Sequence, residues 1–286
     1  METLHHIQAL RQALAGPRRA GQRIALVPTM GNLHEGHLEL VATARAHADL
    51  VVATIFVNPL QFGEGEDLDA YPRTLAEDQA GLARAGCDLL FAPSTRELYP
   101  KGLDVQTRVQ VAGVSEGLCG SSRPGHFDGV ATVVSLLFNL VQPDVACFGE
   151  KDYQQLAVIR QLTRDLHFPV EIVGAPIVRA ADGLALSSRN GYLSEEERAQ
   201  APGLYATLCE LRDALIAGTP AANAIATAHE RLVSRGFVPD YLALRRADDL
   251  GEVDTQTQEA IILAAAQLGP ARLIDNLNVS LSQRDG

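Results

Sequence analysis

The sequence predicts an α/β protein with a Rossmann-like, doubly wound parallel sheet, followed by a second, smaller α+β domain. Between residues 24 and 173, short apolar runs alternate with segments whose apolar residues recur at helical spacing. The run from Leu50 to Val57 is apolar without alternation, as in a strand that is buried on both faces. The pattern changes after Pro176, so we expect a first domain over residues 1–176 and a second over residues 177–286.

The expected elements of the first domain begin with an amphipathic helix in the first 20 residues. Gly86 and Pro143 each end a later helix. We also expect an edge strand in the weakly alternating segment 105–111. The other expected strands are 24–27, 50–57, 89–92, 145–148 and 170–173, and the other expected helices are 34–48, 75–85, 130–141 and one that opens at 149–152.

The second domain is expected to begin with helices and to end with strands. Ser194 and Glu197 have the spacing of a capping box, which marks the start of a helix. Two amphipathic helices then extend to about Ser234. Three short strands follow at 241–244, 261–265 and 273–275, an order typical of an α+β unit.

Charge and cysteine usage limit the classes of partner. The chain has 24 Lys and Arg against 35 Asp and Glu, a net charge of −11, so it lacks the basic surface that nucleic acids and anionic membranes attract. No apolar run approaches the length of a membrane span. The cysteines form no C-x-x-C pair, which fits a reducing compartment, and we expect a cytoplasmic protein; they are Cys87, Cys119, Cys147 and Cys209.

The stretch from Pro28 to His37 is the first candidate site. A strand runs into a glycine-bearing turn that carries His34 and His37, and a helix follows, which is the geometry that presents free N–H groups to an anion. The spacing His-Glu-Gly-His is one residue short of the zinc motif H-E-x-x-H. We expect the helix N-terminus to lower the pKa of both rings, so that each is neutral and donates one N–H. The alternative is that the two histidines only cap the helix.

Lys151 is the second candidate, in a chain whose only other lysine is Lys101. It opens a helix, where the macrodipole disfavours a cation, so its compact charge suits a ligand phosphate. The adjacent Asp152 suits a ribose hydroxyl or a Mg²⁺-bound water. A solvated surface lysine is the alternative interpretation.

Two further groups of polar residues are candidates, one just past the domain boundary at 176 and one that includes two residues at the carboxyl end of the strand 50–57. Ser187, Ser188 and Arg189 form a turn that suits a polyphosphate, although such loops are also common without ligands. The amides of Asn58, Gln61 and Gln155 suit a hydroxyl or a carboxylate of a substrate. The dinucleotide fingerprint G-x-G-x-x-G, the P-loop and a nucleophile elbow are all absent from the sequence.

Together these segments resemble the pantoate–β-alanine ligases, over nearly the whole chain. H-x-G-H alone indicates only the wider nucleotidylyltransferase superfamily, whereas five motifs in order are specific. The matching segments are 28–37, 56–62, 123–127, 148–155 and 186–191.

The resemblance implies an ATP-dependent ligase that works in two steps. Pantoate's carboxylate attacks the α-phosphate of ATP to give pantoyl adenylate and pyrophosphate, and the amine of β-alanine then displaces AMP. It also implies Mg²⁺ as cofactor and a cytoplasmic homodimer. The alternatives are a nucleotidylyltransferase that acts on another small substrate and a nucleotide-binding module without turnover.

The resemblance also implies roles for particular residues. His37 takes the catalytic position, and His34 and Lys151 neutralise phosphate charge beside it. Gln61 and Gln155 match the pantoate-binding glutamines, with Gln61 also reaching β-alanine. The metal ligands and the roles of Arg123 and His126 stay open. The implied ATP-binding residues are Met30, Gly31, Asn32, Leu33, His34, Glu35, Gly36, His37, Gly149, Glu150, Lys151, Asp152, Val178, Leu186, Ser187, Ser188 and Arg189.

Overall fold

The first part of the chain forms a six-stranded, entirely parallel sheet. The computed structural model describes residues 1–63, 65–66 and 68–281. The strand order is β1-β4-β3-β2-β5-β6, which confirms the predicted doubly wound sheet. Its strands are β1 (Glu2–Leu4), β2 (Ile24–Thr29), β3 (Leu50–Ile55), β4 (Leu89–Phe91), β5 (Val145–Gly149) and β6 (Glu171–Ala175).

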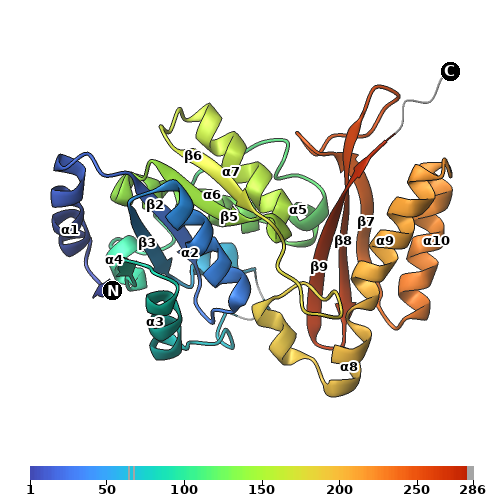
Figure 1. Ribbon diagram of the computed structural model, residues 1–286, viewed down its shortest axis with the longest axis horizontal. Coiled ribbons are helices and arrows are strands. Elements are labelled where there is room, and N and C mark those ends of the chain that lie inside the picture. Colours follow the sequence, from blue (N-terminus) through green and yellow to red (C-terminus); the bar gives the residue numbers. More distant parts are fainter. Residues whose placement is uncertain (64, 67, 282–286) are drawn as a thin grey trace.

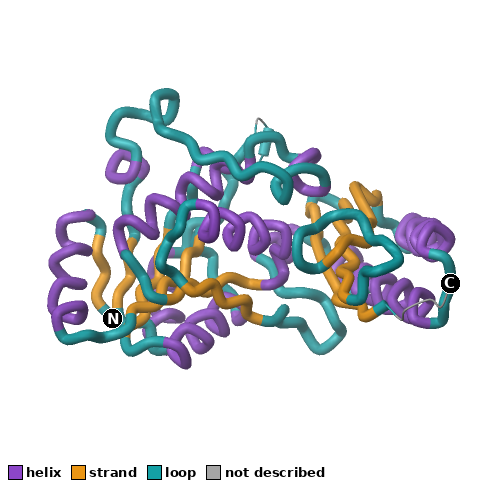
Figure 2. Tube along the Cα trace, turned by 90° about the horizontal axis from the view of Figure 1, so that it is seen from above, coloured by secondary structure: helices purple, strands orange, loops and turns teal. Residues whose placement is uncertain are grey.

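Helices cover both faces of this sheet (Figures 1 and 2). The helices α2 (Glu35–His47) and α3 (Leu75–Arg84) pack on one face, where Val41 and Leu82 join a core with Val27 and Val51. On the other face lie α1 (Ile7–Arg19), α6 (His126–Val141) and α7 (Tyr153–Asp165). The shorter helices are α4 (Thr95–Leu98), α5 (Leu118–Ser122) and the 3-10 turns η1 (Pro59–Gln61), η2 (Glu150–Asp152) and η3 (Ser188–Tyr192).

The last part of the chain forms a three-stranded antiparallel sheet of order β7-β8-β9. The helices α9 and α10 lie on its outer side, away from the parallel sheet (Figure 1). They bury a second core with the strands, which includes Leu208, Leu232 and Ile262. The elements are α8 (Glu195–Gln200), α9 (Gly203–Ile216), α10 (Ala221–Ser234), β7 (Val238–Arg246), β8 (Glu259–Leu268) and β9 (Ala271–Ser280).

Two expectations about secondary structure need correction. Residues 105–111 do not form the predicted edge strand, because the segment crosses α6, where the Val109 N–H donates to the Thr132 hydroxyl at 2.9 Å. The edge strand is instead β1, which pairs with β4. The antiparallel sheet is preceded by three helices, α8, α9 and α10, and not by the two that were expected. The predicted capping box of Ser194 and Glu197 is confirmed at α8.

The order of the strands places the candidate residues together at the carboxyl ends of the parallel strands. The chain leaves β2 for β3 and β4 on one side and returns for β5 and β6 on the other, so the switch point lies between β2 and β5. Ligands of doubly wound folds bind outside the carboxyl ends of the strands at such a point. No helix in the described part of the chain is both long and apolar enough to cross a membrane.

Candidate active site

The turn between β2 and α2 is held in shape by a buried carboxylate. Gly31 and Asn32 both have positive φ angles, 85° and 51°. The Asp78 side chain, 3% exposed, accepts the N–H of Asn32 at 2.9 Å and that of Leu33 at 2.8 Å. Asp78 therefore fixes the backbone that leads to the two histidines. No sequence pattern pointed to this role, because an Asp in the first turn of a helix is ordinary.

The backbone sets the tautomer of both histidine rings. His34 caps α2: its Nδ1 accepts the N–H of Gly36 at 3.1 Å, while the N–H of His34 donates to Nδ1 of His37 at 3.3 Å. Because both Nδ1 atoms are acceptors, each neutral ring carries its proton on Nε2. The ring centroids are 4.1 Å apart. The histidines thus cap the helix and also retain one N–H donor each.

Both rings are neutral at physiological pH. Burial, aided by the charge of Lys151, lowers the pKa of His34 to about 4. Burial and the neighbouring His34 lower the pKa of His37 to about 3. The predicted direction is confirmed, but burial rather than the helix N-terminus is the main cause. Two close imidazolium ions would repel each other, so neutral rings are what this packing permits.

Gln61 lies at the carboxyl side of β3 and is held from several sides. Its Oε1 accepts from Nδ2 of Asn58 at 3.1 Å, and Asn58 is in turn held by the Tyr99 hydroxyl at 2.8 Å. Asn58 is 1% exposed and lies behind the cavity wall, so in this structure it acts on Gln61. Its predicted contact with substrate stays a prediction.

Arg123 and His126, whose roles the sequence leaves open, support the same residue. Nδ1 of His126 lies 2.8 Å from the Gln61 carbonyl, so it is the protonated nitrogen, and Nε2 accepts from Arg123 at 3.0 Å. Burial and the Arg123 charge lower the pKa of His126 to about 4. Arg123 also forms a two-bond ion pair with Glu66, at 2.8 and 2.6 Å. Glu64 and Asp67, on either side of residues 65–66, lie outside the described residues.

The approach of α6 to this region depends on a glycine. A Cβ atom at Gly129 would lie 2.3 Å from the carbonyl oxygen of Leu60 and 2.5 Å from the N atom of Gln61. The backbone of η1 therefore packs directly against α6. The Asn58 side chain adds a bond to the Gly129 carbonyl at 3.0 Å.

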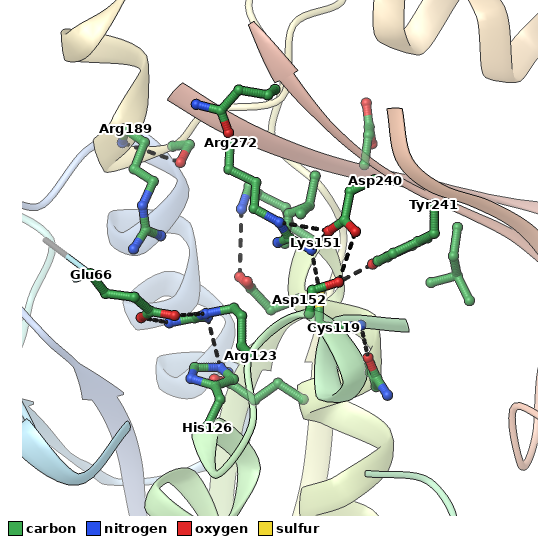
Figure 3. Close-up of a pocket in the computed structure, with 18 of the residues that line it drawn as sticks. Glu66, Cys119, Arg123, His126, Lys151, Asp152, Arg189, Asp240, Tyr241 and Arg272 are labelled. Carbon is green, nitrogen blue, oxygen red and sulfur yellow. Dashed lines mark hydrogen bonds and ion pairs between the residues drawn. The ribbon is translucent and has the colours of Figure 1, made fainter. Parts of the chain in front are cut away.

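Lys151 lies in η2, at the carboxyl end of β5, and faces the cavity with Asp152 beside it (Figure 3). Its Nζ is 3.7 Å from Oδ2 of Asp152. Partial burial would raise the pKa of Asp152, whose side chain is half exposed, but the charges of Lys151 and Arg189 outweigh this effect and lower that pKa. The same cavity is lined by an Arg272–Asp240 ion pair and Tyr241, from the antiparallel sheet (Figure 3).

The segment after β6 that contains Ser187 and Ser188 forms another wall of the site. The Ser188 hydroxyl donates to the Asn32 carbonyl at 3.0 Å, which joins this segment to the histidine turn. The Ser187 hydroxyl accepts the N–H of Arg189 at 3.3 Å and so caps η3. Segments that lie more than 150 positions apart in the sequence therefore form one wall.

These elements enclose two adjoining cavities of about 220 and about 620 Å³. The smaller, inner cavity reaches the histidines, Gln61 and an apolar wall from α6. The larger, outer cavity opens between the two sheets. Residues that line both are Arg123, His126, Lys151, Asp152, Gln155, Ser187 and Arg189.

Most of the predicted site residues meet at these cavities, and a few do not. Glu35 is exposed on α2 and is not among the lining residues. Asn32 and Leu33 contribute the backbone that Asp78 holds. The predicted residues at the inner cavity are Met30, His34, Gly36, His37, Gln61, Gly149, Lys151, Asp152, Gln155, Val178, Leu186, Ser187, Ser188 and Arg189.

This arrangement defines the class of protein. A histidine-bearing helix start at the switch point of a parallel sheet, faced by Lys151, is typical of α/β enzymes that bind nucleotide phosphates.

Comparisons with known proteins give the family. A sequence model described as pantoate-beta-alanine ligase matches residues 2–278. The pantothenate synthetase of Chromohalobacter salexigens is 64% identical over 281 residues, 98% of this chain and 99% of the relative. That of Pseudomonas putida is 58% identical over 285 residues, 99% of each chain.

Solved structures agree. The pantothenate synthetase of Thermus thermophilus superposes with a TM-score of 0.91 at 51% identity, over 97% of this chain and 99% of that one. The Francisella tularensis pantoate-beta-alanine ligase, complexed with beta-gamma ATP and beta-alanine, has a TM-score of 0.81 at 32% identity, over 97% of each chain. The chain belongs to the pantoate–β-alanine ligase family, and it is a ligase.

Proposed function

We propose that this ligase uses ATP to condense pantoate with β-alanine, giving pantothenate, AMP and pyrophosphate. A carboxylate oxygen of pantoate attacks the α-phosphorus, and the bond to pyrophosphate breaks. The amine of β-alanine then attacks the acyl carbon of pantoyl adenylate, loses a proton and displaces AMP. Family membership supports the overall reaction. The observation that carries it is the inner cavity, where His34, His37 and Lys151 face the amides of Gln61 and Gln155.

The proposed roles follow from the charges that develop. Pantoate is already a carboxylate at neutral pH, so adenylation requires in-line positioning and stabilisation of phosphate charge rather than a strong base. The Nε2–H groups of His34 and His37 and the ammonium of Lys151 supply donors on one side. Ser187 and Arg189 supply them on the other, while Ser188, whose hydroxyl donates to the Asn32 carbonyl, holds this wall in place.

The inner cavity also suits the proposed acid substrate. Gln61 and Gln155 offer amide groups for the hydroxyl and carboxylate of pantoate. Opposite them an apolar wall suits its branched carbon chain. This wall consists of Val130, Val133, Val134, Leu137 and Phe148.

The proposed cofactor Mg²⁺ fits the carboxylates of the cavity. Such ions are bound by one or two carboxylates together with ligand phosphates. In the described residues no three His, Cys, Asp or Glu side chains form a metal-holding group. Glu66, Asp240 and Asp275 each pair with an arginine, whereas Asp152 lies 3.7 Å from Lys151 and is half exposed. Asp152 would hold the ion, which when bound would neutralise phosphate charge.

We further propose that residues 1–176 bind ATP and pantoate and that residues 177–286 act as a lid. Asp240, Tyr241 and Arg272 on the antiparallel sheet line the outer cavity, which supports this division. The resemblance described above is the basis for a cytoplasmic homodimer. Sedimentation of the purified chain would measure its oligomeric state.

One assay separates the proposed function from its alternatives. We expect ATP and pantoate to release pyrophosphate, and AMP to appear only when β-alanine is added. A nucleotidylyltransferase for another substrate would release no pyrophosphate with pantoate. A silent nucleotide-binding module would bind ATP in calorimetry and release nothing. β-Alanine-independent AMP production would contradict the second step.

A further inference from the structure

Asn276, on the middle of β9, reaches across from the antiparallel sheet to the turn that carries Lys151. Its Nδ2 donates to the carbonyl oxygen of Glu150 at 2.8 Å and to that of Lys151 at 3.0 Å. The side chain is 5% exposed. Because both partners are carbonyls, only the NH₂ group of the amide fits this position. An amide nitrogen has two protons, and here each has its own acceptor.

The backbone of Asn276 is itself fixed by a buried ion pair. Arg179 donates to both carboxylate oxygens of Asp275, at 2.6 and 2.8 Å, and the N–H of Asn276 donates to Oδ1 of Asp275 at 2.8 Å. The Arg179 guanidinium also lies 3.6 Å from the centre of the Tyr205 ring. Asp275 is 4% exposed. The two-bond Arg179–Asp275 ion pair has a defined geometry, and Asp275 is buried. The backbone of Asn276, which is bonded to Asp275, is therefore well positioned.

The turn η2 is short and has no side-chain cap. It is one 3-10 turn of three residues between β5 and α7. The lysine side chain is long and has several rotatable bonds, so the reach of its ammonium depends on where its backbone is held. The two bonds from Asn276 hold the carbonyl groups immediately before and after the Lys151 Cα atom.

We propose that Asn276 is a positioning residue for adenylation: its two hydrogen bonds hold the Glu150–Lys151 turn so that the Lys151 ammonium points into the phosphate site. This inference rests on the role proposed above for Lys151. It also gives β9 a function in the nucleotide site. Arg179 lies in the segment that leads to Ser187, so Asp275 and Asn276 join two walls of the cavity.

The test is a double-mutant cycle in single-turnover pyrophosphate release with ATP and pantoate. We expect Asn276→Asp, which keeps the volume but loses the donor, to lower the rate roughly 10- to 100-fold, the scale of a small misplacement of a reacting group. The KM for pantoate should change by less than about twofold, because Gln61 and Gln155 lie outside the turn that Asn276 holds. Asn276→Ser, with one hydroxyl donor, should give an intermediate rate.

The cycle is completed by Lys151→Ala and the double variant. If Asn276 acts through Lys151, Asn276→Asp should cost less than about threefold in the Lys151→Ala background, although it costs roughly 10- to 100-fold in the wild type. Asn278→Ala, at an exposed position on the same strand, is the matched control and should leave the rate unchanged. Circular dichroism and the Tm confirm the fold of each variant.

Two results would overturn the inference, and they differ in whether the proposed role of Lys151 survives. Additive losses for Asn276→Asp and Lys151→Ala would show that the two residues act independently, and the role of Lys151 would survive. A wild-type rate for Lys151→Ala would remove Lys151 from the mechanism and the positioning role with it.

Discussion

The N–H of His34 donates to Nδ1 of His37 at 3.3 Å, and this bond decides which nitrogen of His37 faces the ligand cavity. With Nδ1 used by the backbone, the proton lies on Nε2. The same ring is buried, which keeps it neutral. His37 is therefore a hydrogen-bond donor of fixed direction. Two amide side chains of different length should replace it with different success.

His37→Gln is expected to retain more activity than His37→Asn. The glutamine amide reaches the position of Nε2, whereas the asparagine amide reaches only that of Nδ1. His37→Ala should lower the rate of adenylation by roughly 10²–10³-fold, the loss seen when a preorganised donor is removed. Single-turnover pyrophosphate release measures all three. Equal rates for the Gln and Asn variants would contradict the assignment of the Nε2 proton.

Lys151→Ala should produce a loss of the same size, roughly 10²–10³-fold, in the same step. Lys101→Ala, at the other lysine of the chain, is the control, since Lys101 is exposed and does not line either cavity. A loss of tenfold or less for Lys151→Ala, with the fold intact, would exclude a main role in phosphate stabilisation.

The free energy of unfolding should decrease as the pH falls from about 6.5 towards about 4. The pKa values of His34 and His126 are about 4 in the folded protein, against about 6.5 in an unfolded chain. In this window the unfolded state binds more protons than the folded state, so stability is present above the unfolded pKa and is lost on acidification.

His126→Asn tests this dependence, because its amide can still donate to the Gln61 carbonyl. Urea unfolding of the variant at about pH 7 and about pH 5 should show a smaller pH effect than the wild type, by at most about 1.4 kcal/mol per pH unit. His229→Asn, at an exposed position on α10, is the control. An unchanged pH slope in the His126 variant would contradict the neutral, buried ring.

Gly129→Ala should destabilise the fold and weaken pantoate binding. The added Cβ would meet backbone atoms of Leu60 and Gln61, which cannot move away without shifting η1. We expect a loss of about 1–3 kcal/mol in the free energy of unfolding, as for overpacking, and a raised KM for pantoate. Gly16→Ala in α1 meets no atom within 4 Å beyond its own chain neighbours and helix backbone and, with Pro17 following it, should change the free energy of unfolding by less than about 1 kcal/mol. A wild-type KM in the Gly129 variant would show that η1 adapts.

Asp78→Ala should disorder the histidine turn. It removes the acceptor of two backbone N–H groups, at Asn32 and Leu33, and each bond to a charged acceptor contributes about 1.5–3 kcal/mol. We expect lower stability in urea and a raised KM for ATP. Glu77→Ala, one position earlier and exposed on the same helix, should change neither quantity by much. An unaltered ATP dependence in Asp78→Ala would mean that the turn holds its shape without the carboxylate.

The sequence predicted those parts of the protein that depend on local pattern. Alternating apolar runs gave the parallel sheet, and the capping box gave the start of α8. The H-x-G-H turn, Lys151 and Ser187 to Arg189 were identified as candidates because their types suit phosphates, and the structure brings them to one cavity. The edge strand was misplaced because the pairing partner of β4, the N-terminal β1, is set by packing and not by local alternation.

Local sequence patterns therefore specify the fold class, the family motifs and the chemistry of the ligand-facing side chains. Which residues hold those side chains in place depends on how distant segments pack together. Asp78, Tyr99, Gly129 and Asn276 act through backbone atoms or side chains that lie 40 or more positions away in the sequence. A hydrogen bond or a close backbone approach depends on distance in space, so no local pattern of residues reveals it.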